Sequence, residues 1–597
     1  MVMKFLSLNT VIIRNYRRFF PIKFYPILFA HADVSRNLVQ TVFYFPNMGC
    51  RSSNLSDQKT TQKSEDEYIE DIVCNETDIG ENEMKVFNLK DVGKVLLIKQ
   101  NGRLHSLGSK CTHYGAPLVN SALGDGRIRC QWHGACFNIQ TGDIEDFPGV
   151  DSLPCHQVTV VNGKVSVRAK LSELENSNRT KPMCKKLKDT NEHFIIIGGG
   201  PAGAVCVETL RQENFSGSIT MVCKENHLPY DRVKVSKVGD FDIEHNQFRN
   251  PDFYREHDIE VILGVAAIKV DSKAKVVHLE NGQNMKFDKL FIATGAQAAV
   301  LDVPGKNLKN IITLRNYEDG QYLISQLSPD KNVVINGSSF IAMEAASCCA
   351  DKVKSVTVVS RSEVPFKQVL GDKVGAAFMK LFKEKGVTFR IKTNIVEVKD
   401  DGTGKVGEVQ LQTGEKLKAD ILVLGIGSKF NTEFLLGSGI DLRKDRSIEV
   451  DAYLQSNKAE IFAGGDIVHA PVFSSNNEKV TIGHYALAHY HGRIAALNMI
   501  GKKQELRVVP FFWTSLFGKS VRYAGNGKFT DVVFVGNVDE LKFVAFYIKA
   551  NGEVIAASSC GMDPVVSQFA ELLFQGKKLY KKDLDKDPLD WVKNVLP

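Results

Sequence analysis

Two short Cys–His pairs carry the most specific chemistry in this sequence. Cys111 and His113 are followed, after sixteen intervening residues, by Cys130 and His133. A [2Fe–2S] centre in which two cysteines bind one iron and two histidines bind the other needs this set of ligands. Zinc is the alternative, but zinc sites usually pair cysteine with cysteine and histidine with histidine at short spacing. The spacing therefore favours the iron–sulfur centre.

A glycine-rich turn further along the chain predicts a dinucleotide site. Gly198, Gly200 and Gly203 follow the apolar run 194–197 and open a helical pattern. These glycines suit a tight turn, a close approach to a pyrophosphate, and tight packing of helix on strand. The helix N-terminus then faces the phosphates. Glu225 ends the next strand and is expected to bind a ribose hydroxyl; a solvated turn residue is the alternative.

A second strand–turn–helix unit begins at residue 332 and predicts a second nucleotide site. Its turn keeps Gly337, but Ser339 and Ala342 stand where the second and third glycines would be. The side chain of Ser339 is added where a pyrophosphate approaches, which weakens coenzyme binding in general. We expect this unit to bind the nicotinamide coenzyme.

The strand end in this second unit bears on the choice of coenzyme. Ser360 and Arg361 stand where an NAD-selective site would place an acid on the ribose hydroxyls. A hydroxyl and a guanidinium can bond a 2′-phosphate, whereas a carboxylate would repel it. We expect the site to accept NADPH as well as NADH. An outward Arg361, or Glu363 turned inward, would instead favour NADH.

The segments that must hold these residues differ in their predicted secondary structure. Residues 67–170 alternate short β-runs with Asn-Gly turns at 101–102 and 162–163, which predicts a small all-β domain. From residue 192 the strand–turn–helix units predict two doubly wound α/β domains, and residues 506–597 predict a C-terminal α+β domain. The expected segments are 1–66 (targeting segment and polar linker), 67–170, 171–191 (linker), 192–313 and 447–505 (two parts of one nucleotide-binding domain), 314–446 (the other), and 506–597.

Charge and hydropathy narrow the classes of function. Residues 1–50 hold six Lys/Arg and one Asp, a local +5, which leaves +2 of the total +7 for the rest of the 597-residue chain. A near-neutral body gives no electrostatic basis for binding nucleic acid. No apolar run is long enough to span a bilayer. The basic, acid-free residues 1–30 predict a mitochondrial presequence; an untargeted N-terminal tail on a cytoplasmic protein is the alternative.

The Cys–His segment resembles the Rieske family, with CTHYGAP at 111–117 and CQWHGACFN at 130–138 as its two cluster loops. High-potential members of the family carry an extra cysteine in each loop. Ala116 and Trp132 stand at those positions here, and Ala135 replaces a hydroxyl residue that would donate toward the cluster. With fewer donors around the reduced cluster, the resemblance implies a low reduction potential.

The remainder resembles the pyridine-nucleotide-dependent flavin reductases close to apoptosis-inducing factor and the ferredoxin reductases. The resemblance is carried by the segments LPYDRVKVSK at 228–237, LFIATG at 290–295, IFAGGD at 461–466 and PFFWT at 510–514. It implies that the first site holds FAD and that Asp466 contacts the ribityl chain.

The same resemblance implies roles for four residues around the flavin. Arg232 and Lys237 are expected along the ring, and Glu344 is expected to pair with Lys237 beside its reactive edge as the catalytic pair. Trp513 is expected among the cofactor-binding residues. Val233 replaces the family's proline after Arg232, and for each charge a plain surface ion pair is the alternative.

The sequence thus predicts an NAD(P)H-dependent FAD oxidoreductase fused to a Rieske [2Fe–2S] domain. The flavin loop 228–237 has no cysteine, so its outlet is expected to be a one-electron acceptor, reached through the cluster. The acceptor is not specified, and a homodimer is possible. The rival hypothesis is a pro-apoptotic signalling protein in which the cofactors control conformation or oligomerisation. His484, His489 and His491 lack an acidic or thiol partner and are not expected to bind metal.

Overall fold

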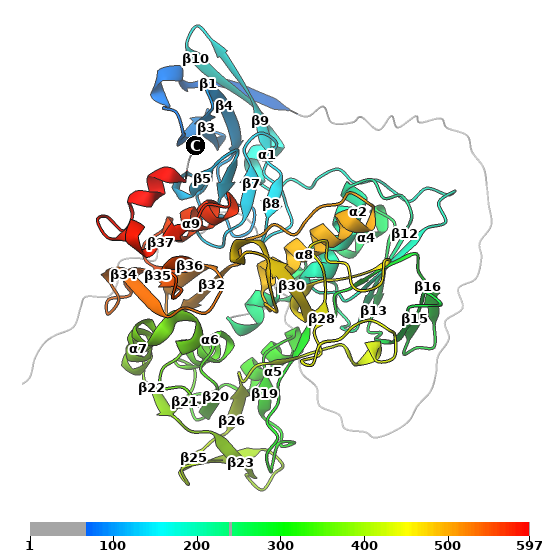
Figure 1. Cartoon of the computed structure of the whole chain (residues 1–597), viewed down its shortest axis with the longest axis vertical. Coiled ribbons are helices and arrows are strands. Elements are labelled where there is room, and N and C mark those ends of the chain that lie inside the picture. The colour runs from blue at the N-terminus through cyan, green and yellow to red at the C-terminus, as the bar shows by residue number, and fades with distance from the viewer. Residues whose placement is uncertain (1–66, 238–241, 596–597) are drawn as a thin grey trace, which may run out of the picture. The chain divides into compact units, whose positions relative to one another are not determined.

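The structure is a computed structural model that describes residues 67–237 and 242–595 (Figure 1). The predicted targeting segment and linker at 1–66 lie outside the described residues. The described residues form one compact unit, so the seven segments expected from the sequence stay predictions. Within the part of the chain that the structure describes, no helix is both long and apolar enough to cross a bilayer.

Two antiparallel sheets carry the Cys–His loops, and their strand orders are β1-β10-β9-β4-β3-β2 and β5-β6-β7-β8. The Asn-Gly pairs at 101–102 and 162–163 form the turns of two hairpins, with positive φ at all four residues, as predicted. The strands are β1 (Tyr68–Asn75), β2 (Glu83–Leu89), β3 (Gly93–Gln100), β4 (Arg103–Gly108), β5 (Ala122–Gly124), β6 (Arg127–Arg129), β7 (Cys136–Asn138), β8 (Ile144–Asp146), β9 (Cys155–Val161) and β10 (Lys164–Lys170). The predicted linker begins with a short helix, α1 (Leu171–Glu175).

Two five-stranded parallel sheets follow, as the strand–turn–helix pattern predicted. Their orders are β13-β12-β11-β17-β29 and β19-β26-β20-β21-β22. The first sheet contains β11 (His193–Ile197), β12 (Ser218–Cys223), β13 (Ile259–Leu263), β17 (Lys289–Ile292) and β29 (Ile461–Ala463). The second contains β19 (Ile311–Thr313), β20 (Asn332–Asn336), β21 (Ser355–Ser360), β22 (Val387–Ile391) and β26 (Ile421–Leu424). The inner strands β11, β17, β20 and β26 are almost entirely buried, which is why they read as near-continuous apolar runs.

Helices connect and cover these parallel sheets. Helix α2 (Pro201–Gln212) follows the first glycine-rich turn, and α6 (Phe340–Cys349) follows the second. Helix α8 (Tyr485–Met499) packs along α2, and the two lie side by side in Figure 1. Both turns therefore point a helix N-terminus toward the carboxyl ends of parallel strands, where nucleotides bind in such folds.

The C-terminal segment is an antiparallel sheet with one long helix, matching the predicted α+β class. The strand order is β32-β33-β36-β35-β34, and α9 (Val565–Phe574) contacts both this sheet and β5 of the Cys–His segment. The strands are β32 (Phe511–Leu516), β33 (Lys519–Gly525), β34 (Asp531–Asn537), β35 (Lys542–Ile548) and β36 (Glu553–Cys560). Helix α9 thus contacts both the Cys–His segment and the C-terminal sheet.

Candidate functional site

The two Cys–His loops have the same backbone design. In the first, the amide of Cys111 donates to the carbonyl of Ala116 at 2.9 Å; in the second, Cys130 donates to Ala135 at 2.7 Å. In each loop the glycine four residues after the cysteine has positive φ and donates back to that cysteine's carbonyl. Two matched loops thus present one thiol and one imidazole each.

The four side chains meet as two like pairs. The Nδ1 atoms of His113 and His133 lie 3.1 Å apart, and the buried thiols of Cys111 and Cys130 hydrogen-bond to each other. That thiol–thiol bond raises the pKa of Cys111 and lowers that of Cys130. Among the described residues, no three Cys, His, Asp or Glu side chains gather as they would around a single metal ion. Two pairs suit two irons with two protein ligands each better than one zinc ion with four.

Burial keeps both imidazoles in the neutral form that binds metal. It lowers the pKa of His113 to about 3 and, with the charge of His113 next in effect, that of His133 to about 2. The Nε2 atom of His113 is buried and has no hydrogen-bond partner in the described part of the chain. The donor set, its burial and its neutral histidines therefore fit a Rieske-type cluster.

A large cavity of about 2670 Å³ lies at the carboxyl end of the first parallel sheet and reaches the second. Gly198 has φ +124°, and a Cβ there would lie 2.2 Å from the carbonyl oxygen of Ala293. A Cβ on Gly203 would lie 2.0 Å from the carbonyl oxygen of Gly198, whereas at Gly200 it would meet nothing. The backbone is therefore open at Gly200 toward the cavity, as close approach of a pyrophosphate requires.

Glu225 lies at the mouth of this cavity and is tied to its neighbours. Its carboxylate accepts hydrogen bonds from Arg232 at 2.5 Å and from the phenol of Tyr230 at 2.8 Å. Although burial opposes the shift, Arg232 holds the pKa of Glu225 below its usual value. Glu225 is thus an ionised, fixed acceptor and not a freely solvated turn residue. Arg232, expected along the flavin ring, is paired with this acid.

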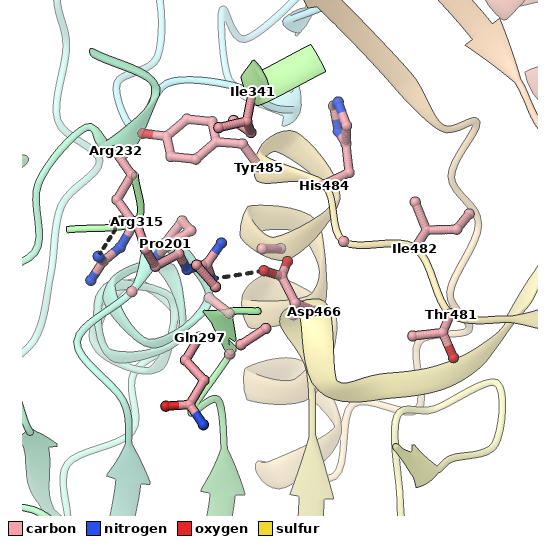
Figure 2. Close-up of a pocket in the computed structure, with 18 of the residues that line it drawn as sticks. Pro201, Arg232, Gln297, Arg315, Ile341, Asp466, Thr481, Ile482, His484 and Tyr485 are labelled. Atoms are coloured by element: carbon pink, nitrogen blue, oxygen red, sulfur yellow. Dashed lines mark hydrogen bonds and ion pairs between the residues drawn. The ribbon is translucent and has the colours of Figure 1, made fainter. Parts of the chain in front are cut away.

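Figure 2 shows Arg315 and Asp466 facing each other inside the cavity, with Tyr485 and His484 nearby. The guanidinium of Arg315 donates to the carboxylate of Asp466 at 2.8 Å. Asp466 was expected to contact the ribityl chain, whereas Arg315 belongs to no motif recognised in the sequence. His484, at the start of α8, lines the cavity with a buried Nδ1 that has no partner among the described residues.

Lys237 and Glu344 form an ion pair across two elements, with Nζ and Oε1 3.0 Å apart. Glu344 lies on α6 and is buried; it also accepts hydrogen bonds from Ser236 at 2.5 Å and from Thr514 at 2.7 Å. A buried carboxylate with three donors keeps one position. Because both residues line the cavity, the pair is a fixed polar element of its wall.

The second turn departs from the glycine pattern without loss of close packing. Gly337 has φ +117°, and a Cβ there would lie 2.2 Å from the carbonyl oxygen of Gly425. Ala342 replaces the third glycine, and its Cβ occupies the space that a side chain on Gly425 would need. Ser339 is the N-cap residue of α6 and lines the cavity. A glycine on the neighbouring strand end thus accommodates the alanine.

The residues expected to influence the choice of coenzyme lie at the end of β21 and just after it. Ser360 is buried, and its hydroxyl bonds that of Ser338 at 2.6 Å. Arg361 is exposed and has no ion-pair partner within residues 67–237 and 242–595. Glu363 is held by Lys392 at 2.5 Å and by Lys367 at 3.3 Å. The acid that could have turned toward the ribose is therefore neutralised by two lysines.

Trp513 connects the cavity to the Cys–His loops. It lies on β32, lines the cavity, and places its ring centroid 4.3 Å from that of His133 and 5.7 Å from that of His113. The sequence indicated a cofactor residue here but not this contact.

Two further histidines that the sequence analysis named, His489 and His491, are buried in α8, and burial lowers the pKa of each to about 4.

Comparison with known proteins identifies the class. The model of the pyridine nucleotide-disulphide oxidoreductase family matches residues 192–492, and that of the Rieske [2Fe-2S] domain matches residues 70–157. The chain therefore belongs to the pyridine nucleotide-disulphide oxidoreductase family, with a Rieske domain ahead of the reductase part. It is an NAD(P)H-dependent flavoprotein oxidoreductase with FAD and a [2Fe–2S] cluster as cofactors.

Individual relatives narrow the class. Apoptosis-inducing factor 3 of Mus musculus is 43% identical over 528 residues, 87% of both chains. The ferredoxin–NAD(+) reductase component of the 3-phenylpropionate/cinnamic acid dioxygenase of Photorhabdus laumondii is 31% identical over 60% of this chain and 90% of its own. The solved ferredoxin reductase for the CYP199A2 system of Rhodopseudomonas palustris is 26% identical with a TM-score of 0.64, covering 68% of this chain and all of its own. The chain is thus a ferredoxin-reductase-like oxidoreductase fused to a Rieske domain.

Proposed function

We propose that this protein passes electrons from NADH or NADPH through FAD to its own cluster, from which a separate one-electron acceptor removes them. Bound FAD accepts a hydride as an electron pair, and the cluster accepts one electron at a time. Cys111, His113, Cys130 and His133 are the proposed cluster ligands. The acceptor is proposed by its chemistry alone, as a one-electron oxidant.

The position of Trp513 carries this proposal. Its ring lines the flavin cavity on one side and lies 4.3 Å, between ring centroids, from His133 on the other. A proposed cluster ligand and the cavity wall are therefore separated by one aromatic side chain, with no intervening solvent layer required. This geometry supports transfer within one chain.

The polar wall of the cavity supports the first half of the reaction. We propose that Lys237 and Glu344 orient the reacting edge of the flavin, since their ion pair is held by Ser236 and Thr514. Thr514 directly follows Trp513 on β32. One strand therefore helps to position the proposed catalytic pair and also bears the ring next to the cluster loops.

The cysteine content of the cavity wall supports transfer of electrons from the flavin to a one-electron acceptor. Cys223 is the one cysteine among the described residues that line the cavity. Burial raises its pKa to about 12, so it stays a thiol at neutral pH. Flavin reductases that act on disulfides need two cysteines that can form one. A single buried thiol does not supply that route.

Anaerobic rapid mixing with NADPH tests the proposal. Flavin reduction is followed by absorbance and cluster reduction by paramagnetic resonance of rapidly frozen samples. We expect Trp513→Leu to reduce its flavin at the wild-type rate and its cluster more slowly, and the aromatic Trp513→Phe to fall between. Equal FAD and iron contents are the control for folding. A wild-type cluster that stays oxidised while the flavin is reduced would contradict the proposal and favour the signalling hypothesis.

We also propose that residues 1–30 direct the protein to mitochondria, on the sequence pattern alone. A fluorescent fusion of the full chain should colocalise with a mitochondrial marker. A fusion that lacks residues 1–30 should be cytoplasmic. Cytoplasmic fluorescence of the full chain would contradict the proposal.

A further inference from the structure

The second cluster loop is held largely by residues from outside its own sheet. Three of its backbone carbonyls accept hydrogen bonds from side chains: Cys130 from Ser567 at 3.2 Å, Trp132 from Arg522 at 3.3 Å and Gly134 from Arg129 at 3.0 Å. Ser567 lies on α9 and Arg522 on β33, both in the C-terminal part of the chain. A Cβ on Gly134 would lie 2.6 Å from the ring of Phe511, so loop and sheet are in close contact.

A buried group of four charges lies directly behind this loop. Arg129 donates to Glu571 at 2.5 Å and to Asp146 at 2.6 Å, and Arg127 donates to Asp146 at 2.9 Å. Arg127 and Glu571 approach to 3.5 Å. All four side chains are nearly or fully buried, and the exposed fraction of Glu571 is 0%. Two guanidiniums and two carboxylates balance, as buried charges must.

This balance depends on residues from two distant segments of the chain. Arg127, Arg129 and Asp146 belong to the Rieske sheet, whereas Glu571 comes from α9. Without Glu571, Asp146 would be the one buried carboxylate left beside the two guanidiniums, since Glu145, 3.6 Å from Arg127, is partly exposed. Such an imbalance of buried charge is strongly destabilising. Arg129 directly precedes Cys130 and also holds the carbonyl of Gly134. Removing the carboxylate of Glu571 should therefore displace Arg129 and with it the loop that carries Cys130 and His133.

Other contacts join the Rieske segment to the flavin-binding part of the chain. Arg493 of α8 donates to the carbonyl of Ile144 at 2.6 Å, and Arg249 pairs with Asp151 at 2.7 Å. The Rieske segment is thus fixed to two different parts of the reductase.

We propose that Glu571, Ser567 and Arg522 are positioning residues for the cluster, and that the cluster stays docked beside Trp513 throughout turnover. The C-terminal part of the reductase completes the second ligand loop, so the Rieske segment does not shuttle between flavin and acceptor. This inference rests on the proposed function, because it takes Cys130 and His133 as ligands. It implies that the acceptor comes to the docked protein.

The first test uses Glu571→Gln and Ser567→Ala in the full-length holoprotein. Positioning residues around metal ligands usually affect metal affinity by about 10–100-fold. We expect iron loss to a chelator to accelerate in that range for Glu571→Gln and less for Ser567→Ala, with shifted paramagnetic resonance g values and unchanged FAD content. Glu553→Gln is the matched control, because this buried carboxylate of β36 pairs with Lys578 and takes no part in the contacts described for the loop.

The second test asks whether docking is permanent. A protease site is inserted between the exposed Lys188 and Asp189, and the purified holoprotein is cleaved there. The two fragments of the nicked wild type should co-elute in gel filtration, and those of nicked Glu571→Gln should separate. If Glu571→Gln fails to bind FAD, the Ser567→Ala iron-loss rate and the nicked wild type decide the question.

The outcomes separate this inference from the function on which it rests. A wild type without a Rieske signal would overturn the proposed ligands and this inference with them. Two results would overturn the docking inference alone, provided that the wild type shows a normal Rieske signal. One is separation of the nicked wild-type fragments. The other is that Glu571→Gln and Ser567→Ala have the wild-type rate of iron loss and the wild-type g values.

Discussion

The phenol of Tyr114 donates a hydrogen bond to the carboxylate of Asp231. This bond joins the first cluster loop to the segment 228–237, which contains Arg232 and Lys237. The ring of Tyr114 also stacks on His113, with centroids 3.7 Å apart and planes 17° apart. Asp231 accepts in addition from the amide of Val233 at 3.1 Å, which begins the short helix Arg232–Ser236. A proposed cluster ligand and the loop of Arg232 and Lys237 are therefore connected through two side chains.

Tyr114→Phe should loosen this connection without removing the ring from His113. A hydrogen bond to a carboxylate contributes about 1.5–3 kcal/mol when buried, and the 38% exposure of Tyr114 reduces this to about 1–2 kcal/mol. We expect the loss to appear as a lower denaturant midpoint in the visible absorbance of the cluster, with a smaller change in flavin fluorescence. Tyr453→Phe is the surface control, since Tyr453 donates to Glu505 at 3.2 Å in an exposed pair. Equal midpoints for Tyr114→Phe and wild type would show that the bond is not stabilising.

His113→Ala and Cys130→Ala should each abolish the cluster and leave FAD bound. The glycines of the flavin turn and Glu225 lie on other elements, so the loss of a cluster ligand does not touch them. Iron and acid-labile sulfide should fall to background while the FAD-to-protein ratio is kept. Metal analysis of the wild type discriminates the alternatives, because about two irons per chain indicate the [2Fe–2S] centre and one zinc does not. A full Rieske resonance in His113→Ala would show that the ligand assignment is wrong.

Local patterns predicted the elements, because strands, turns and capped helices depend on neighbouring residues. The Asn-Gly hairpins and the β-strand to α-helix turns are therefore where the sequence indicated. Tyr114 and Asp231 are 117 residues apart, and Arg129 and Glu571 are 442 apart, so their contacts depend on how distant segments pack. Arg127 and Arg129, in the short strand before Cys130, are buried in the structure and therefore need buried acids. With 69 Asp and Glu in the chain, the sequence could not say which ones.

In the flavin cavity, too, the sequence indicated some of the residues that lie together and missed others. The resemblance to flavin reductases implied that Lys237 and Glu344 pair, and their Nζ and Oε1 atoms lie 3.0 Å apart. It gave no indication of Arg315, whose partner Asp466 lies 151 residues away, because Arg315 belongs to no recognised motif. A partly buried carboxylate in a cavity wall favours a cationic partner, but its position in the sequence does not identify that partner.

Glu344→Gln and Lys237→Met should slow flavin reduction more than they weaken FAD binding. Both side chains line the cavity, and Glu344 accepts three hydrogen bonds, of which the one from Lys237 carries charge. Glutamine keeps the shape and removes that charge. Stopped-flow reduction by NADPH gives the rate, and FAD titration of the apoprotein gives the affinity. Glu318→Gln, at the cavity rim and paired with His227, is the control. Parallel losses of rate and affinity would assign the pair a structural role instead.

Arg361→Ala should lower kcat/KM for NADPH and leave that for NADH nearly unchanged. The exposed guanidinium has no ion-pair partner among the described residues, and Ser360 beside it offers a hydroxyl rather than a repelling carboxylate. A charge-assisted bond to a 2′-phosphate contributes about 1.5–3 kcal/mol, which corresponds to roughly tenfold or more in kcat/KM. Lys392→Ala is the informative companion. It removes the closer of the two lysines that hold Glu363, so the freed carboxylate should disfavour NADPH and raise the relative use of NADH. Steady-state kinetics with both coenzymes and a fixed artificial acceptor give the ratio for each variant. A strong NADH preference in the wild type, unchanged in Arg361→Ala, would show that the guanidinium points away from the coenzyme and does not select it.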